Sequence, residues 1–269
     1  MGIGQQFLMH PKTKINSFSK SSIIFDNNDN FTYCDSENLS SIKLNQISLS
    51  KGKALENWIL KNNIENDSQL IISNNAGLFI PEALFDKNFI TDYYDKFDKM
   101  EESDIIESNL SCNHLNSIIF KVPNKLQSVK AKYLNKSKFV HYQTLIYNYL
   151  ISESKQNSDK KLYVNIQKDS FDFFLFFSDQ LILANRFPNS GSDSFLYFLY
   201  FIVEKNELKE NEFFISFLGR YSNYNEYYIS SKLFHDKVEF ILEEESHPKG
   251  NNSSTPFLLD LHAHYFRHS

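Results

Sequence analysis

One stretch, Lys161–Pro188 (KLYVNIQKDSFDFFLFFSDQLILANRFP), limits what this chain can fold into more than any other. Three runs of β-branched and aromatic residues alternate in it with turn-forming residues, which predicts three consecutive strands joined by two tight turns. The middle run, Phe171–Phe177, is apolar on both faces, as is typical of a central strand covered by a layer on each side. A helix with an apolar stripe at helical spacing is expected next, with Ser192 as its N-cap.

The two halves of the chain repeat one order of elements. In the second half the three strands and the helix are followed by a strand at 212–217, a helix at 225–234 and a strand at 238–242. In the first half, strands between 23 and 49 precede a helix at 53–62 and a strand at 69–73. The landmarks Gly52 with Gly191, and Ile72 with Ile215, lie at nearly the same separation, which indicates duplication of one β-β-β-α-β-α-β unit. A further helix is expected at His141–Ser154 between the halves.

The predicted organisation is two subdomains, residues 17–154 and residues 155–269. The first carries an inserted segment at about 76–115 that has no counterpart in the second. The second contains a polar tail segment at 243–254. After that tail, Phe257–Phe266 is apolar enough that we expect it to dock on the rest of the protein.

Composition excludes several classes of protein. The net charge of −5 and the pI of about 5.9 argue against a nucleic-acid binder, which needs a basic surface. No apolar run approaches the roughly 18 residues of a membrane span, and the first residues lack the apolar core of a secretory signal. With 2 cysteines the chain has too few for a disulfide scaffold, so a reducing cytoplasm is the expected compartment.

Two β-β-β-α-β-α-β units in tandem form the arrangement of actin-like ATPase folds, in which two RNase-H-like subdomains with mixed α/β sheets surround a cleft. The segments LIISNNAGLFIPEALFD, KLYVNIQKDSFDFFLFFSDQLILANRFP, DSFLYFLYFIVEK and FFISFLGRYS also resemble, in order, domain-of-unknown-function family 3822, a bacterial family found mainly among Bacteroidetes. The resemblance covers most of residues 20–242. It implies an actin-like ATPase fold and supplies no catalytic residues.

The turns that would hold the phosphates of ATP lack glycine, the residue type that phosphate binding requires there. Actin-like ATPases hold phosphates on two hairpins, one in each half, where a turn with little side-chain bulk lets backbone N–H groups approach. The corresponding turns here, Asn165–Ser170 and Asp26–Asn30, contain no glycine. The chain has 7 glycines in 269 residues, well below the usual share of about 7%. No cofactor is therefore expected. The degenerate cleft would be lined by Asn165, Lys168, Asp169, Gly219 and Arg220.

Other candidate sites are outweighed by simpler interpretations. Asp260, His262 and His264 form the start of a D-x-H-x-H pattern that could hold zinc, but a docking strand with incidental polar positions explains it better. Cys112 and His114 are too close in sequence to be expected as a thiol–imidazole pair.

A pair of aspartates and a group of tyrosines also have simpler interpretations than a catalytic site. Asp169 with Asp172 could imitate the paired acids of a nuclease, yet Asp172 is a lone acid in a phenylalanine-rich strand. Tyr221, Tyr224, Tyr227 and Tyr228 are left as surface aromatics for a partner, because tyrosine is favoured at interfaces.

Two hypotheses about function remain. The favoured one is a non-catalytic actin-like module, a pseudo-ATPase, that binds an unidentified protein or acts as a scaffold, because the architecture is kept while the phosphate loops are lost. The alternative is an ATP-binding or phosphotransfer enzyme of the actin-like or sugar-kinase class with a nonstandard site.

Overall fold

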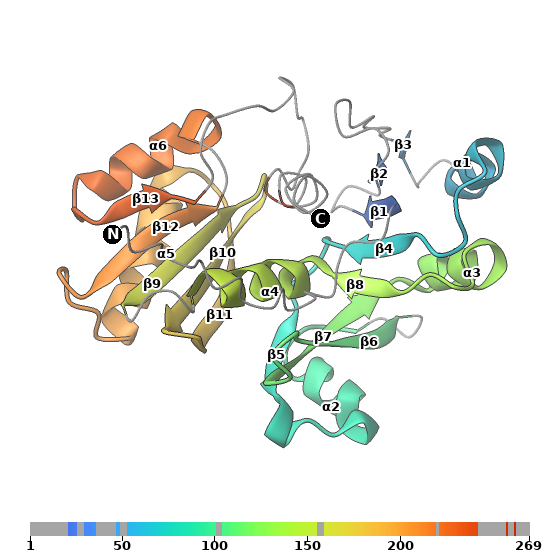
Figure 1. The fold of residues 1–269 in the computed structure, drawn as a ribbon, viewed down its shortest axis with the longest axis horizontal. Coiled ribbons are helices and arrows are strands. Elements are labelled where there is room, and N and C mark those ends of the chain that lie inside the picture. Colours follow the sequence, from blue (N-terminus) through green and yellow to red (C-terminus); the bar gives the residue numbers. More distant parts are fainter. Residues whose placement is uncertain are drawn as a thin grey trace, which may run out of the picture.

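The computed structural model describes residues 21–25, 30–35, 47–48, 53–100, 104–154, 159–218 and 221–241, together with Phe257 and Leu261. These residues form two lobes on either side of a central helix, α4 (Tyr142–Ser154), and a small third sheet beside the first lobe (Figure 1).

The first lobe is built on a five-stranded sheet with the order β3-β2-β1-β4-β8. Its strands are β1 (Ser21–Phe25), β2 (Asn30–Asp35), β3 (Ile47–Ser48), β4 (Gln69–Ile72) and β8 (Phe139–His141). β1 runs antiparallel to β2 and parallel to β4, so the sheet is mixed. Helices α1 (Ala54–Asn62) and α3 (Asn124–Tyr133) bury their apolar stripes against it, with Trp58 of α1 packed edge-on against Phe31.

The second lobe repeats this plan with the order β11-β10-β9-β12-β13. Its strands are β9 (Lys160–Ile166), β10 (Ser170–Phe177), β11 (Gln180–Pro188), β12 (Phe213–Leu218) and β13 (Val238–Phe240), and its helices are α5 (Ser192–Lys205) and α6 (Tyr221–Lys232). In both lobes the first three strands are antiparallel neighbours and the last two join in parallel. The predicted fold, a tandem repeat of one mixed α/β unit, is confirmed.

An inserted sheet of three antiparallel strands extends the first lobe. It has the order β5-β7-β6, from β5 (Leu78–Pro81), β6 (Ile105–Leu110) and β7 (Asn116–Val122). Two 3-10 turns (Glu82–Leu84 and Lys87–Phe89) and α2 (Ile90–Asp95) lie between β5 and β6. The sheet reaches Val122, farther than the segment at 76–115 expected from the sequence. The division into subdomains at residue 154 stays a prediction.

The start of α5 differs from the expected one by one residue. Gly191, not Ser192, is the N-cap, with a φ of 112° that an L side chain rarely adopts. The Ser194 hydroxyl stabilises this turn, because it accepts a hydrogen bond from the Ser190 N–H at 3.0 Å and donates one to the Gly191 carbonyl at 2.9 Å.

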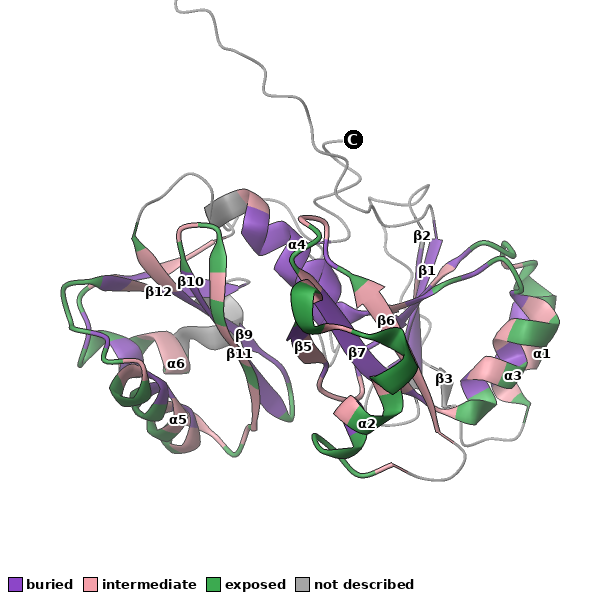
Figure 2. Ribbon diagram, turned by 90° about the horizontal axis from the view of Figure 1, so that it is seen from below, coloured by how far each residue is buried: buried purple, intermediate pink, exposed green. Residues whose placement is uncertain are grey.

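Helix α4 is buried along nearly its whole length, and Figure 2 shows it enclosed between the lobes. Its apolar side chains belong to a core cluster that contains Ile71 from the first lobe and Phe174 from the second. Phe257 and Leu261 are buried in the same cluster, so these two residues of the C-terminal stretch dock as expected. Within the described residues, no helix is long and apolar enough to cross a membrane.

Candidate functional site

The hairpin between β9 and β10 occupies the place where the second phosphate loop was expected. The Gln167 N–H donates to the Ser170 carbonyl at 2.9 Å and closes a turn whose tip, Lys168 and Asp169, is exposed. Asn165, the third candidate of this hairpin, is buried and points away from the tip toward Asp172.

Asp172 lies at the centre of a buried polar network behind this hairpin. Four side-chain donors hold its carboxylate: Tyr142 Oη (2.7 Å) and Gln143 Nε2 (3.1 Å) on Oδ1, and Asn165 Nδ2 (2.7 Å) and Gln167 Nε2 (2.7 Å) on Oδ2. A carboxylate has about four lone-pair positions, so these donors use its accepting capacity. The carboxylate is therefore engaged by the chain itself and offers no free position for a metal ion.

Burial and charge act on Asp172 in opposite directions. Burial raises the pKa of this carboxyl above its ordinary value, while the positive charge of Arg186 and the hydrogen bonds oppose the rise. Arg186 stands directly opposite Asp172 in the register of β10 and β11. Its guanidinium also donates to the Tyr142 hydroxyl at 3.2 Å and to the Asn75 carbonyl at 2.7 Å. The network thus connects β11 of the second lobe to the loop after β4 of the first.

The same network continues into the first lobe through His141. The imidazole is fully buried, and its Nε2 lies 3.2 Å from the Asn75 carbonyl, to which it can only donate. Burial, which outweighs the Asn75 hydrogen bond, lowers the pKa of His141 to about 3, and Arg186 contributes to the fall. Gly77 lies so close that an added Cβ would be 2.8 Å from Nδ1. Its N–H donates to Gln143 Oε1 at 2.8 Å.

The two pairs of reactive residues that the sequence analysis set aside are placed as follows. Asp169 is exposed at the hairpin tip whereas Asp172 is fully buried, so the two do not form a nuclease-like pair of acids. Cys112 and His114 lie in the turn between β6 and β7, where His114 takes a left-handed φ of 57° and is exposed. In the part of the chain that the structure describes, no group of three potential metal ligands comes together.

Two expected surface aromatics are half-buried and pack against the core of the second lobe. Tyr227 packs edge-on against Phe195, with ring centroids 5.4 Å apart, and Tyr228 lies 5.2 Å from Phe240. Among the residues of this lobe whose burial is described, the exposed aromatics are Phe177, Tyr197, Tyr200, Phe201 and Phe234. Gly219, Arg220, Asp260, His262, His264, most of the Asp26–Asn30 turn and the side chains of Tyr221 and Tyr224 lie outside the residues that can be described.

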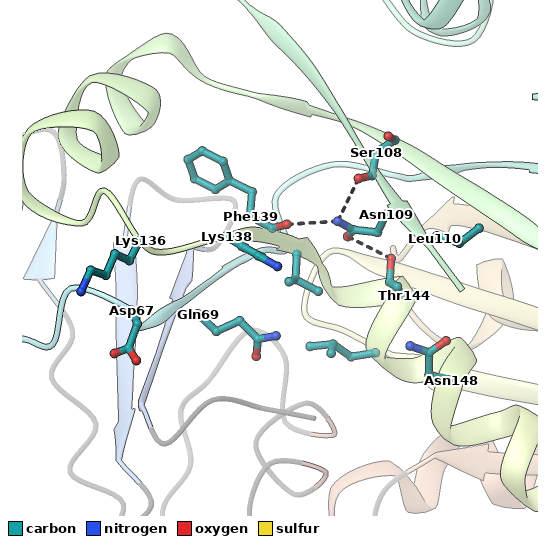
Figure 3. Close-up of a pocket in the computed structure, with 12 residues that line it drawn as sticks. Asp67, Gln69, Ser108, Asn109, Leu110, Lys136, Lys138, Phe139, Thr144 and Asn148 are labelled. Atoms are coloured by element: carbon teal, nitrogen blue, oxygen red, sulfur yellow. Dashed lines mark hydrogen bonds between the residues drawn. The ribbon is translucent and has the colours of Figure 1, made fainter. Parts of the chain in front are cut away.

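An open groove of about 500 Å³ lies between the inserted sheet, the start of α4 and the β4–β8 edge of the first lobe (Figure 3). It is lined by Asp67 and Gln69 at the start of β4, Ser108, Asn109 and Leu110 of β6, Lys136, Lys138, Phe139 and Val140 at β8, and Thr144, Leu145 and Asn148 of α4. We call it the β6–β8 groove. Among the strands that the structure describes, β6 and β8 lie at the edges of their sheets, so each has one side without a described strand neighbour.

The Asn109 side chain forms hydrogen bonds with the backbone groups at the unpaired edge of β8. Its side-chain amide donates to the Phe139 carbonyl at 3.0 Å (Figure 3). It also accepts from the His141 N–H at 2.7 Å, as the peptide group of a neighbouring strand would. Thr144 donates to the same amide oxygen at 3.3 Å. The edge of β8 is therefore closed by a side chain, which is one way in which proteins protect edge strands from further pairing.

Sequence reasoning missed the polar residues of α4, although they left a signal. Gln143, Thr144 and Asn148 interrupt an otherwise apolar pattern, and buried polar side chains need partners. Gln143 reaches Asp172 in the second lobe, Thr144 reaches Asn109, and Asn148 accepts from the Cys112 N–H at 2.9 Å. The three exceptions mark the contacts of the central helix with β10 and with the inserted sheet.

Two lobes that repeat one mixed sheet around a connecting helix define the class of actin-like ATPase folds. Within that class, the chain belongs to the family "Protein of unknown function (DUF3822)", which matches residues 16–238. The resemblance noted in the sequence is thereby confirmed.

Solved structures agree at the level of the fold. A Bacteroides thetaiotaomicron protein with an actin-like ATPase fold and unknown function matches with a TM-score of 0.71 and 17% identity, over 93% of this chain and 98% of its own. The PilM–PilN type IV pilus biogenesis complex matches with a TM-score of 0.53 and 11% identity, over 91% of this chain and 96% of the matched chain. No curated protein sequence matches the chain.

Proposed function

We propose that this protein is a non-catalytic actin-like module that binds another protein and does not hydrolyse ATP. The observation that carries the proposal is the closed network around Asp172. In a nucleotide-dependent member of this class, acids near the phosphate hairpins must remain available to a metal ion and its water ligands. Here the buried acid behind the second hairpin is saturated by four side chains of the same protein.

The β6–β8 groove supports the protein-binding part of the proposal. Its volume of about 500 Å³ is in the range of ligand-binding clefts, and it lies beside an edge strand. One structural neighbour at the fold level comes from a PilM–PilN type IV pilus biogenesis complex. That neighbour motivates the idea of a protein partner and does not identify it.

Thermal unfolding with and without Mg-ATP tests the proposal. A ligand present at 100 times its Kd stabilises a protein by about 2.7 kcal/mol, which for a chain of this size corresponds to a rise in Tm of roughly 5–10 °C. We expect no shift at millimolar Mg-ATP. A rise of several degrees, or ATP turnover that scales with protein concentration, would overturn the non-catalytic assignment.

The second candidate is an ATP-binding or phosphotransfer enzyme of the actin-like or sugar-kinase class. The two-lobed architecture, retained in full, favours it. The same melting experiment separates the two candidates, because only the enzyme requires nucleotide to bind between the lobes.

A further inference from the structure

The β6–β8 groove also indicates how a partner would bind, and this inference rests on the function proposed above. We infer that the groove takes an extended, acidic segment of another protein, which pairs as an additional strand with the free edge of β6. The partner's acidic side chains would face Lys136 and Lys138.

The register of the inserted sheet shows which backbone groups of β6 are available. In antiparallel pairs, residues that exchange hydrogen bonds alternate with residues that do not. The Ser111 N–H donates to the Asn116 carbonyl at 2.9 Å, so Asn109, two residues earlier, also faces β7. Ser108 and Leu110 therefore direct their backbone groups away from β7, and both residues line the groove.

The choice of β6 over β8 follows from Asn109. Its side chain already occupies the Phe139 carbonyl and the His141 N–H, the two groups that β8 would offer to a new strand. On β6 the Asn109 amide also donates to the Ser108 carbonyl at 3.2 Å, and the Cys112 N–H donates to Asn148 of α4 at 2.9 Å. The outward-facing backbone groups of Leu110 lie between these two contacts. Leu110 is 39% exposed, so its side chain is accessible to a strand that pairs at this edge.

The charges that line the groove select the chemistry of the partner. Lys136 and Lys138 are exposed, and neither ammonium takes part in an ion pair within the described residues. Asp67 is the one acid in the lining, so the groove is positive whereas the chain as a whole has a net charge of −5. Such a local reversal of charge favours an acidic partner and speeds its association.

The side chains of a bound strand alternate between two surroundings. Leu145, Val140 and Leu110 supply an apolar side to the groove, and the two lysines supply a polar one. A strand with acidic and apolar residues in alternation would satisfy both, since neighbouring side chains of a strand point to opposite faces. Backbone pairing would give affinity and the alternating side chains would give specificity, as in other cases of strand addition.

The test uses fluorescently labelled seven-residue peptides with blocked ends and the full chain. The acidic probe alternates glutamate with valine, the basic probe alternates lysine with valine, and a third probe is the acidic peptide with its backbone nitrogens methylated. Fluorescence anisotropy should show binding of the acidic probe and, because methylation removes the N–H donors of a pairing strand, binding at least about tenfold weaker for the third. Equal binding of the methylated and unmethylated probes would overturn strand pairing.

Two matched sets of variants complete the test. Leu110→Pro removes an N–H that β7 does not use and should abolish binding of the acidic probe, while Leu110→Ala, which keeps the N–H, should weaken it only slightly. The double variant Lys136→Glu with Lys138→Glu leaves the fold untouched at two exposed positions and should exchange preference from the acidic to the basic probe. If Leu110→Pro binds as Leu110→Ala does, or if charge reversal has no effect, the inference is wrong.

These outcomes are separate from those that decide the proposed function. A failure of every peptide to bind would overturn the strand-addition inference, while the absence of an Mg-ATP shift would still support a non-catalytic module. A positive Mg-ATP shift would overturn the proposed function whatever the peptides do.

Discussion

Acid should destabilise this protein through one buried side chain, His141. The folded state lowers the pKa of His141 to about 3, chiefly because burial disfavours the charged imidazolium. In the unfolded chain the same group titrates near 6.5. Between these two values the unfolded state binds a proton that the folded state cannot take up. The free energy of unfolding must therefore fall as the pH drops below 6.5, and this loss continues until about pH 3.

The magnitude follows from the same two values. Each pH unit below the ordinary pKa costs about 1.4 kcal/mol for one group, so His141 alone should remove about 2 kcal/mol between pH 7.5 and pH 5. That loss is a considerable fraction of the free energy of unfolding of a typical protein, which is roughly 5–15 kcal/mol. Burial also raises the pKa of the Asp172 carboxyl, so the wild type by itself cannot isolate the contribution of the histidine.

Urea unfolding of two matched variants isolates the contribution of His141 to the pH dependence of stability. His141→Gln keeps a donor toward the Asn75 carbonyl, to which Nε2 lies at 3.2 Å, and removes the titration. His114→Asn is the matched control, because His114 is exposed and asparagine tolerates its left-handed φ of 57°. We expect the control to lose as much stability as the wild type between pH 7.5 and pH 5. We expect His141→Gln to lose about 2 kcal/mol less. Equal losses in all three proteins would refute the reasoning.

Three other outcomes follow from the same interior. Gly77→Ala should destabilise the fold by about 1–3 kcal/mol in urea titrations, because the new Cβ would lie within 2.9 Å of two buried side chains; an unchanged midpoint would contradict this close packing. Asp172→Asn should cost about 3 kcal/mol, since it removes the charge opposite Arg186 and places an NH2 donor where a carboxylate oxygen accepted hydrogen bonds; thermal melting measures it, and a stabilised variant would show that the buried charge costs more than its contacts return. In a Cys112→Ser background, iodoacetamide should modify Cys34 only on unfolding, because burial raises its thiol pKa to about 12; rapid labelling of the native protein would contradict its burial.

The sequence was sufficient to predict elements whose signal is local. Alternation and turn chemistry placed the three strands of the second lobe, and the repeat of their order in the first half predicted the two-lobed fold. The N-cap of α5 was placed one residue late because two small residues compete there, and the φ of 112° at Gly191 decides between them. N-cap preferences rank residue types and contain no information on the backbone angle at a particular position.

The candidate sites could be predicted less well, because their contacts join distant parts of the chain. Asn109 closes the edge of β8 through hydrogen bonds to Phe139 and His141, and no pattern in the neighbouring sequence predicts these contacts. The sequence showed Asp172 as a lone acid, yet its donors come from α4, from Asn165 at the end of β9 and from Gln167 in the turn that follows. The absence of glycine from the phosphate turns was visible, but the network behind them was not.

The shared core between the lobes bears on both proposals. Enzymes of two-lobed architecture close around their substrates by hinge or shear motion, which requires an interface that can separate at low cost. Here one apolar cluster joins Ile71 of the first lobe to Phe174 of the second, and Phe257 adds a third segment. Exposing each such side chain costs about 1.5–3 kcal/mol, and separation would also break the contact of Arg186 with the Asn75 carbonyl. A protein held together in this way gains little from binding between its lobes, whereas the β6–β8 groove can accept a strand without moving either of them.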